Sequence, residues 1–287
     1  MRVAILGSSG QLGQTFRRKF GSISNVELVC PDRFELDLSN TSSIENWLVS
    51  NSPDCIFNCA AYTKVEQAED DVFLAESINA RALIPIAEFA NQHKVSLLHF
   101  STDYVFDGKS NLPYRETDVT RPLNAYGRTK LQGEIELLER CPNATIIRIS
   151  WLFSEFGHNF LKTMLKLFEE RNTVQVVQDQ IASPTYAGLM VDDLITWWQK
   201  DPTFGGGGLY HYAQEGEASW FDFALEIAKL VQADVVINPV QTVDFPSRAL
   251  RPTYSKLDAT HFIQNSGIVP EPWQLGLQRC LENLRFQ

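Results

Sequence analysis

Cysteine and histidine are scarce in this chain, and neither is arranged as a disulfide framework or a metal site requires. The 287 residues include five cysteines, an odd number without any CxxC pair. The five histidines form no HExxH motif and no cluster with the cysteines. We therefore expect reduced cysteines that pack inside a cytoplasmic protein, and no bound metal.

Basic residues and long apolar runs are also in short supply. Twenty-five Lys and Arg stand against 35 Asp and Glu, which gives a formal net charge of -10. This excess of negative charge disfavours nucleic acid and anionic membranes as partners. No apolar run reaches membrane-spanning length, and residues 1–6 enter an apolar strand directly, without the features of a signal peptide. With 44% hydrophobic residues, the chain can still bury a substantial core.

Short apolar runs alternate with stretches of helical periodicity in the first half of the chain. Such alternation is typical of crossover units that build a parallel sheet with helices on both faces. We therefore predict an α/β fold around a Rossmann-type, doubly wound parallel sheet. The predicted strands span residues 2–6, 26–30, 54–58, 95–100 and 144–149, and the predicted helices span 11–20, 71–92 and 125–139.

The rhythm of the sequence changes after Ser150. Four consecutive glycines at 205–208 predict a flexible loop. We expect a dinucleotide-binding domain over residues 1–150, to which the chain returns around 185–204. Most of residues 151–287 should form a smaller, mixed α/β substrate-binding lobe. Within that part, helices are predicted at 158–171, 186–199, 220–231 and 273–285, and a strand at 174–177.

A glycine-rich loop follows the first predicted strand and opens the first predicted helix. Gly7, Gly10 and Gly13 are spaced as GxxGxxG. Glycines at such positions permit a tight turn and let backbone N–H groups approach a pyrophosphate, which the helix N-terminus attracts. A glycine triplet alone can also be a plain tight turn, but this position favours a dinucleotide-binding loop.

The second predicted strand is followed by residues that could read the adenosine ribose. Asp32 would accept hydrogen bonds from the ribose and favour NADH, whereas Arg33 would pair with the extra phosphate of NADPH. A third interpretation is a turn with solvated charges. Asp37, before Leu38, could reach the adenine or serve only as a cap or turn residue. The sequence predicts NADPH or NADH as cofactor without choosing between them.

A YxxxK pattern puts Tyr126 and Lys130 on one face of a predicted helix. A nearby ammonium should lower the pKa of the tyrosine and make it a better proton donor. Upstream, Ser101 and Thr102 follow the fourth predicted strand, at the carboxyl edge of the sheet where ligands bind. A YxxxK pattern alone usually marks a surface pair. Together with the hydroxyls and the glycine loop, it predicts a nicotinamide-dependent reductase in which Tyr126 donates the proton.

Taken together, these motifs resemble the extended short-chain dehydrogenase/reductase family, and within it the reductases of dTDP-linked 4-keto-6-deoxy sugars. The matching stretches follow the family's order between residues 7 and 185. They are GSSGQLG at 7–13, NCAAYTKV at 58–65, STDYVFDG at 101–108, NAYGRTKLQGE at 124–134, RISW at 148–151, NFLKTM at 159–164 and DQIASPT at 179–185.

The resemblance implies a reaction and a role for the matching residues. A nicotinamide would deliver hydride to the C4 ketone of the dTDP-sugar substrate, giving dTDP-rhamnose, while Tyr126 protonates the C4 oxygen. Lys130 would bind the nicotinamide ribose, and Thr102 would polarise the carbonyl. The cofactor would be lined by Gly10, Gln11, Leu12, Asp37, Leu38, Ala60, Ala61 and Tyr62. The substrate would be faced by Thr63, Val65, Ser101, Tyr104, Val105, Phe106 and Trp151, with core packing as the alternative for Phe106 and Trp151.

Four positions define the limits of this resemblance. Sugar-nucleotide dehydratases resemble this pattern but carry Glu after the Thr-Asp pair. Tyr104 stands there instead and is a poor base at neutral pH, so we expect reduction rather than elimination. Some relatives have a glutamate linked to metal binding and dimerisation where this chain has Thr15, which leaves a homodimer open. Arg248 and Arg251 could pair with a diphosphate or be surface charges.

Two other functions remain open on the sequence alone. A relative of this fold serves as a non-catalytic regulatory subunit of methionine adenosyltransferase. A reductase or epimerase acting on another nucleotide sugar would also share the fold, because function depends on the site. The joint presence of Thr102, Tyr126 and Lys130 argues against a silent binding module.

Overall fold

The computed structural model describes residues 1–285 and has a six-stranded sheet at its centre. The strands are β1 (Arg2–Leu6), β2 (Glu27–Val29), β3 (Cys55–Asn58), β4 (Ser96–Thr102), β5 (Thr145–Ile149) and β10 (Gly208–His211). They follow the order β10-β5-β4-β3-β1-β2, and every neighbouring pair is parallel. The predicted doubly wound parallel sheet is confirmed. The central strands are buried along nearly their whole length, as helices on both faces require.

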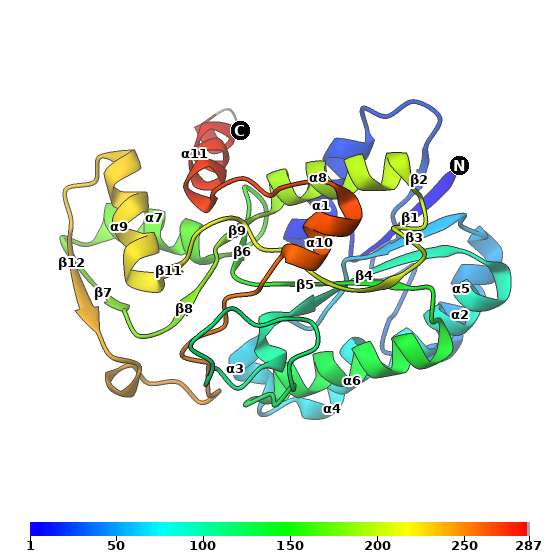
Figure 1. Ribbon diagram of the computed structural model, residues 1–287, viewed down its shortest axis with the longest axis horizontal. Helices are drawn as coiled ribbons and strands as arrows, with labels where there is room; N and C mark the ends of the chain where they lie inside the picture. Colours follow the sequence, from blue (N-terminus) through cyan, green and yellow to red (C-terminus); the bar gives the residue numbers. More distant parts are fainter. Residues whose placement is uncertain (286–287) are drawn as a thin grey trace.

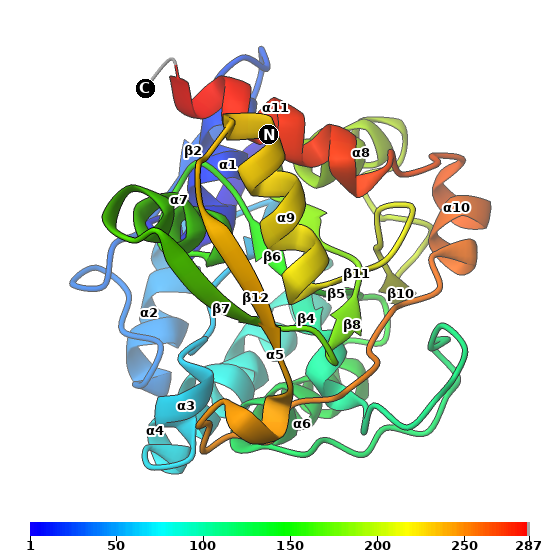
Figure 2. The same cartoon turned by 90° about the vertical axis from the view of Figure 1, so that its left-hand side faces the viewer.

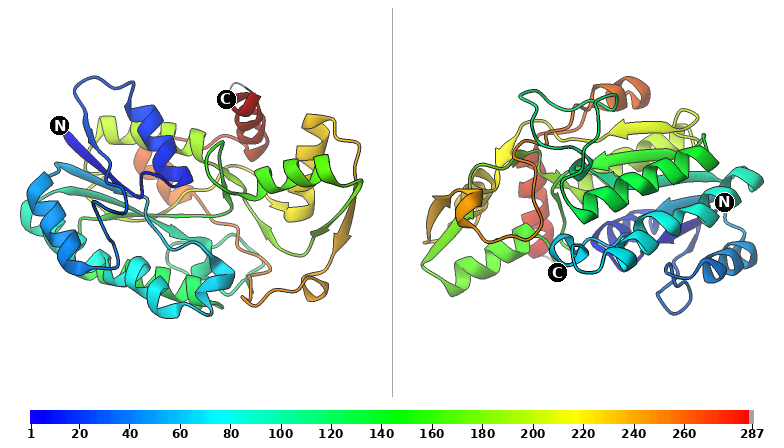
Figure 3. Two further views of the ribbon diagram at one scale, coloured as in Figure 1. Left: turned by 180° about the vertical axis from the view of Figure 1, so that it is seen from behind. Right: turned by 90° about the horizontal axis from the view of Figure 1, so that it is seen from below.

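Helices cover both faces of this sheet (Figure 1). One face carries α1 (Gln11–Phe20), α8 (Ala187–Lys200) and α10 (Thr260–Ser266), and the other carries α2 (Thr41–Asn51), α5 (Leu83–His93) and α6 (Ala125–Arg140). Phe16, Phe57 and Trp198 pack as an aromatic core under α1 and α8. On the opposite face α5 and α6 run side by side (Figure 3).

Polar side chains fix where several of the long helices begin. Asn124 accepts a hydrogen bond from the N–H of Gly127 at the start of α6, at 2.8 Å. Ser219 forms a capping box at the start of α9 (Trp220–Val231). Helix α1 differs, because its N-cap is Gly10 and no side chain accepts from its first turn. The first backbone N–H groups of α1 are therefore left for another acceptor.

The region predicted as one helix over 71–92 consists of three pieces, α4 (Val72–Glu76), a π-helical segment (Ser77–Arg81) and α5. Asn79 in the π segment accepts from the N–H of Tyr62 at 2.8 Å and donates to the hydroxyl of Thr129 at 3.0 Å. Gly133 of α6 packs so closely here that a Cβ would lie 2.0 Å from the carbonyl oxygen of Asn79. The segment thereby joins the loop after β3 to α6.

A second lobe stands beside the sheet, built around a small parallel strand pair (Figure 2). Its elements are β7 (Thr173–Val177) with β12 (Val236–Val240), the short pairs β6 (Leu152–Phe153) with β9 (Thr185–Tyr186) and β8 (Ile181–Ala182) with β11 (Ala218–Ser219), and the helices α7 (Phe160–Glu170), α9 and α11 (Trp273–Arg285). Phe153, Phe223 and Trp273 lie in its core. Between β9 and β11 the chain runs through α8 and β10, which belong to the first lobe.

The glycine run at 205–208 is the entry to a strand rather than only a loop. All four glycines have positive φ, and the last of them begins β10. A Cβ on Gly207 would lie 2.4 Å from the backbone of Asn143, so only glycine allows this approach. Helices α2 and α10 and strand β12 were not predicted, because polar residues interrupt their apolar patterns. Within residues 1–285, no helix has both the length and the apolar character needed to cross a membrane.

Candidate active site

A cleft of about 1050 Å³ opens at the carboxyl ends of the parallel strands. Its walls come from the segments after β1, β2, β3, β4 and β5, and from residues of the second lobe. The strand order reverses between β1 and β3, and open α/β sheets bind ligands at such a switch point. The sequence-predicted residues that line it are Gly7, Gly10, Gln11, Leu12, Asp32, Arg33, Asp37, Leu38, Ala60, Ala61, Thr63, Val65, Ser101, Thr102, Tyr104, Tyr126, Lys130 and Trp151.

The glycine loop after β1 has the shape that a dinucleotide diphosphate needs. Gly7 has a φ of +72°, and a Cβ on it would lie 2.6 Å from the backbone of Ala60. A Cβ on Gly13 would lie 2.3 Å from the carbonyl oxygen of Gly7. Gly10 lines the cleft at the uncapped start of α1. The first backbone N–H groups of α1 donate to no side-chain cap. The loop therefore fits an anion such as a diphosphate.

After β2, Asp32 and Asp37, which were predicted to contact the adenosine, accept hydrogen bonds within local turns. Asp32 Oδ1 accepts from the N–H groups of Phe34 and Glu35, at 2.7 and 3.0 Å. Asp37 Oδ1 accepts from the N–H and the hydroxyl of Ser39, and these bonds lower the pKa of Asp37. The turn interpretation of Asp37 therefore describes its hydrogen bonds, although the residue also lines the cleft.

The predicted catalytic groups meet on the cleft surface. Thr102 ends β4, and its hydroxyl donates to Asp103 Oδ1 at 3.0 Å while accepting from the N–H of Tyr104 at 3.2 Å. Tyr126 lies in the first turn of α6, with its ring against the edge of Tyr104 at 5.8 Å. Burial raises the pKa of Tyr126 to about 12, although the nearby hydroxyl of Thr102 opposes this rise. At neutral pH, Tyr126 is therefore a protonated donor.

The pKa of Tyr126 is raised, not lowered as predicted, and Lys130 is not among the groups that shift it. The amine is buried, and its Nζ donates to the carbonyl of Phe100 at 2.7 Å and lies 3.0 Å from His99 Nε2. Burial lowers the pKa of Lys130 itself to about 8, although the negative charge of Glu134 opposes this. Helical spacing brings the two side chains to one face, but it carries no information about burial, which dominates both pKa values.

Three residues that were predicted to line the site, Tyr62, Val105 and Phe106, lie outside the cleft. A fourth, Ser101, lines the cleft, but its hydroxyl is already hydrogen-bonded within the protein. Val105 and Phe106 are fully buried in a core cluster, with the ring of Phe106 stacked on Tyr114 at 4.1 Å. Core packing is therefore the structural role of Phe106. The hydroxyl of Tyr62 contacts a carboxylate outside the cleft. Ser101 lines the cleft, but its hydroxyl donates to the buried carboxylate of Glu134.

The second lobe adds residues that sequence reasoning missed. Trp220, at the start of α9, stacks on Trp151 with ring centroids 3.5 Å apart and planes inclined by 9°. Trp151 has a φ of +47°, unusual for a large side chain. Phe160 packs on Trp220 at 4.6 Å, and all three aromatics line the cleft. No local motif links Trp220 to Trp151, because only the packing of the two lobes brings them together.

Asp103 is a second omission, although it stands inside the STD motif that was recognised. It forms the first residue of the short helix η2 (Asp103–Val105) and lines the cleft. Its Oδ2 accepts from the hydroxyl of Ser255 at 2.5 Å, and its Oδ1 accepts from Thr102. Burial raises the pKa of Asp103 to about 7, against the effect of these hydrogen bonds. The STD motif that predicted the hydroxyl of Thr102 at the sheet edge could therefore also have predicted Asp103 as a residue of the site.

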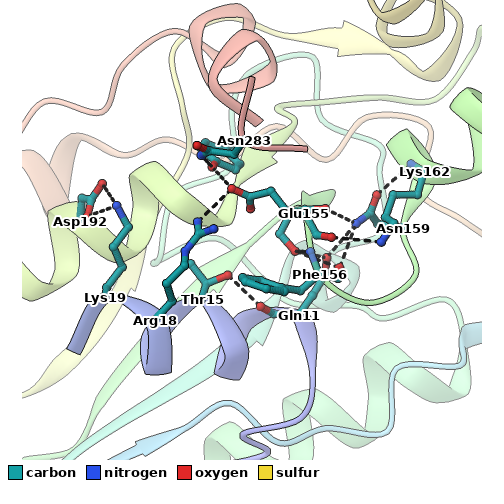
Figure 4. A network of polar contacts seen from close by, with 12 residues as sticks. Gln11, Thr15, Arg18, Lys19, Glu155, Phe156, Asn159, Lys162, Asp192 and Asn283 are labelled. Carbon is teal, nitrogen blue, oxygen red and sulfur yellow. Dashed lines mark hydrogen bonds and ion pairs between the residues drawn. The ribbon is translucent and has the colours of Figure 1, made fainter. Parts of the chain in front are cut away.

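A polar network ties α1 to the second lobe (Figure 4). Glu155 is buried and accepts from Arg18 at 2.9 Å and from the hydroxyl of Tyr186 at 2.6 Å. Thr15, which stands where some relatives have glutamate, donates to the carbonyl of Gln11 at 2.8 Å. Among residues 1–285, no three His, Cys, Asp or Glu side chains gather as a metal site would require. The guanidinium of Arg18 is the charged partner of Glu155 in this network.

The two distal arginines pair with acids of α3 (Val65–Ala68) and the loop after it. Arg251 reaches Glu66 at 2.7 Å, and Arg248 pairs with Asp70. Neither arginine lines the cleft. These ion pairs, with hydrogen bonds from the backbone of Arg248 and Ala249 to Glu66, link the segment at 247–251 to the first lobe.

Comparison with known proteins places the whole chain in one family. The model of the RmlD substrate binding domain matches residues 1–286. A dTDP-4-dehydrorhamnose reductase of Aggregatibacter actinomycetemcomitans is 40% identical over 99% of this chain and 98% of its own length. A protein of the same name from Salmonella typhimurium is 36% identical over the same shares of both chains.

Solved structures agree with these relatives. A dTDP-4-dehydrorhamnose reductase from Clostridium acetobutylicum superposes with a TM-score of 0.94 at 33% identity, covering 99% of this chain and 100% of its own. The protein of that name from Bacillus anthracis, solved in complex with NADP, gives 0.90 at 36% identity over 98% and 99% of the two chains. A UDP-glucose 4-epimerase from Thermotoga maritima shares the fold at 15% identity, with a TM-score of 0.83. The chain belongs to the RmlD substrate binding domain family.

Proposed function

We propose that this chain reduces the C4 ketone of dTDP-4-dehydro-L-rhamnose to dTDP-L-rhamnose, with NADPH or NADH as the reductant. The observation that carries the proposal is the meeting of Thr102, Tyr126 and Lys130 on one cleft, next to the glycine loop. The shared name of the relatives supports the substrate. The structure of a relative in complex with NADP supports the cofactor class.

The first lobe would hold the cofactor along the carboxyl edge of the sheet. The diphosphate would rest on the first turn of α1, and the adenosine end would meet the residues after β2, where Asp32 favours a free ribose and Arg33 a phosphorylated one. When bound, the nicotinamide supplies the hydride that reduces the ketone. Beyond these, the residues proposed to line the cofactor are Gly7, Gly10, Gln11, Leu12, Asp37, Leu38, Ala60 and Ala61.

Tyr126 would give its proton to the C4 oxygen as negative charge develops there. Its raised pKa keeps the phenol protonated in the resting cleft, so the proton is available when the substrate arrives. The hydroxyl of Thr102 would hydrogen-bond the same oxygen and share the charge. Lys130 would hold the ribose next to the nicotinamide and supply positive charge near the phenolate that Tyr126 becomes.

The sugar nucleotide would occupy the rest of the cleft. Thr63, Val65, Tyr104 and Trp151, which line the cleft, would face it. Burial raises the pKa of Tyr104, so this residue remains a neutral phenol and is not a base for eliminating water. Reduction without elimination is the chemistry that these groups support.

The direct test follows the oxidation of NADPH and NADH by absorbance, with enzymatically prepared dTDP-4-dehydro-L-rhamnose. We expect rapid oxidation, and at least tenfold slower oxidation with the corresponding UDP-sugar. Faster turnover with the UDP-sugar would move the proposal to another nucleotide sugar. Cofactor binding without turnover would instead favour the regulatory-subunit interpretation. We also propose that the protein acts in the cytoplasm, where its five cysteines would stay reduced. The net charge of -10 supports the absence of a nucleic-acid partner.

A further inference from the structure

Gln11 belongs to the glycine motif, yet its side chain reaches the second lobe. It is the first residue of α1 and lines the cleft beside Gly10. Its Nε2 donates to the carbonyl of Leu152 at 3.3 Å, and its Oε1 lies 3.3 Å from both Ser154 Oγ and Asn159 Nδ2. The proposed binding of the cofactor uses none of these side-chain contacts.

The partners leave the amide of Gln11 only one orientation. A backbone carbonyl can only accept a hydrogen bond, so the NH2 group of Gln11 must face Leu152. Asn159 Oδ1 accepts from the N–H of Lys162 at 3.1 Å, and the NH2 group of Asn159 therefore faces Gln11 Oε1. Both ends of the Gln11 amide thus have a partner in the second lobe.

The loop at 154–159 closes on itself and fits tightly beside Gln11 (Figure 4). Asn159 Nδ2 donates to the carbonyl of Ser154 at 2.8 Å, and Ser154 Oγ accepts from the N–H of Phe156 at 3.1 Å. Gly157 has a φ of +63°, and a Cβ on it would lie 3.3 Å from the Cβ of Gln11. Glycine meets both demands, the left-handed backbone and the close approach.

The residues that bind the amide stand next to an aromatic wall of the cleft, formed by Trp151, Phe160 and Trp220. Leu152 directly follows Trp151. Asn159 directly precedes Phe160 and caps α7. Trp220 packs against both other rings, with centroids 3.5 Å from Trp151 and 4.6 Å from Phe160. One side chain of the first lobe therefore holds the backbone beside two of the three rings of this wall.

A buried ion pair holds the same loop to α1 independently of Gln11. Arg18, about two turns further along α1, donates to Glu155 at 2.9 Å. Its guanidinium also lies 5.0 Å from the ring centroid of Phe156. Loss of the Gln11 amide should therefore loosen the segment beside the aromatic wall without separating the lobes.

We propose that Gln11 is a positioning residue for the sugar nucleotide, which fixes the aromatic wall through Leu152 and Asn159. The inference rests on the proposed function, because that function places the sugar nucleotide against Trp151. Groups that bind a substrate must be held by the residues behind them, and a shift of about 1 Å can cost about 100-fold in rate. A residue of the glycine motif thus acts on the substrate that the glycine loop itself does not touch.

The first test measures the hold on the segment without any ligand. Amide hydrogen exchange of peptides covering residues 151–164 is followed by mass spectrometry. Gln11→Met keeps the length of the side chain but has no amide, and Gln278→Met changes an exposed glutamine of α11 as the matched control. We expect about tenfold faster exchange in Gln11→Met alone, with exchange in β10 unchanged. Equal exchange in wild type and Gln11→Met would overturn the proposal.

The second test separates the two ligands by calorimetry, with NADP+ first and then dTDP-L-rhamnose at saturating NADP+. Gln11→Met should weaken the binding of dTDP-L-rhamnose about tenfold and change that of NADP+ by less than about threefold. In turnover, kcat/KM should fall mainly through KM for the sugar nucleotide. Weaker binding of NADP+ with unchanged binding of dTDP-L-rhamnose would show that the side chain serves the cofactor and would overturn the proposal.

The two tests also distinguish this inference from the proposed function. If the wild-type protein binds NADP+ but not dTDP-L-rhamnose, the proposed function fails. Faster exchange in Gln11→Met would then still show that Gln11 holds the aromatic wall, because the exchange experiment uses no substrate.

Discussion

Two buried cationic side chains, Arg148 of β5 and Lys130 of α6, differ in whether a carboxylate pairs with them. Arg148 is 3% exposed and holds the carboxylate of Glu134 by two hydrogen bonds, at 2.6 and 2.9 Å. Lys130 is 1% exposed, yet within residues 1–285 no carboxylate hydrogen-bonds its nitrogen. Buried charges are normally paired, so the unpaired one marks the position where a ligand or a reacting group is expected.

The difference between Lys130 and Arg148 predicts that substitutions in the cleft lower the activity and leave the fold intact. Tyr126→Phe deletes only the proton donor and should lower kcat by about 10²- to 10⁴-fold. Cofactor affinity, measured by fluorescence titration, and the free energy of unfolding should stay close to wild type. Retention of the full rate at neutral pH would remove Tyr126 from the mechanism.

Changes at the ion pair should have the opposite effect. Arg148→Met leaves the carboxylate of Glu134 buried without its partner and should lower the free energy of unfolding by about 3–5 kcal/mol. Denaturant titration measures this loss. Arg140→Met, at the partly exposed end of α6, is the matched control and should cost about 1 kcal/mol or less. Equal losses in the two variants would contradict the structural role of the buried pair.

Lys130→Met should affect cofactor binding more than folding. Loss of the amine removes a hydrogen bond to the proposed ribose and should weaken cofactor binding by about tenfold. The variant should also lose any fall in rate at alkaline pH that comes from a group with a pKa of about 8. An alkaline fall that persists unchanged would assign that titration to another residue.

The sequence predicted the first lobe well because its signals are local. The glycine loop, the strands and the first turn of α6 are each defined by residues close in the chain, and they converge wherever parallel strands end. The stack of Trp151 on Trp220 was not predictable, since it depends on how two lobes pack. Glu155 was missed for the same reason.

The errors in the first lobe have a different origin. The resemblance placed Val105 and Phe106 in the substrate-binding site. A motif does not, however, determine in which direction a side chain in or after a short helix points. The shift predicted for the pKa of Tyr126 had the wrong direction, because spacing along a helix indicates proximity and not burial. Contacts with distant residues, such as Ser255 with Asp103, were equally invisible.

The smallest expected effect concerns Asp103, whose pKa is raised by burial to about 7. The folded state prefers the protonated carboxyl, so the stability this group contributes at acid pH is lost as pH rises from about 4 to about 7. Asp103→Asn removes that dependence and should raise Tm relative to wild type at about pH 8, but not at about pH 4. A Tm difference that is the same at both pH values would show that Asp103 does not titrate in this range.

The central claim, hydride transfer to the C4 ketone in this cleft, is tested most directly with NADPH that carries deuterium at its transferable position. The protein is incubated with dTDP-4-dehydro-L-rhamnose, and the sugar product is examined by NMR and mass spectrometry. Our account predicts one deuterium, bonded to C4 of dTDP-L-rhamnose, and formation of this product about 10²- to 10⁴-fold more slowly with Tyr126→Phe. Product without deuterium at C4, or cofactor oxidation that does not depend on Tyr126, would contradict it.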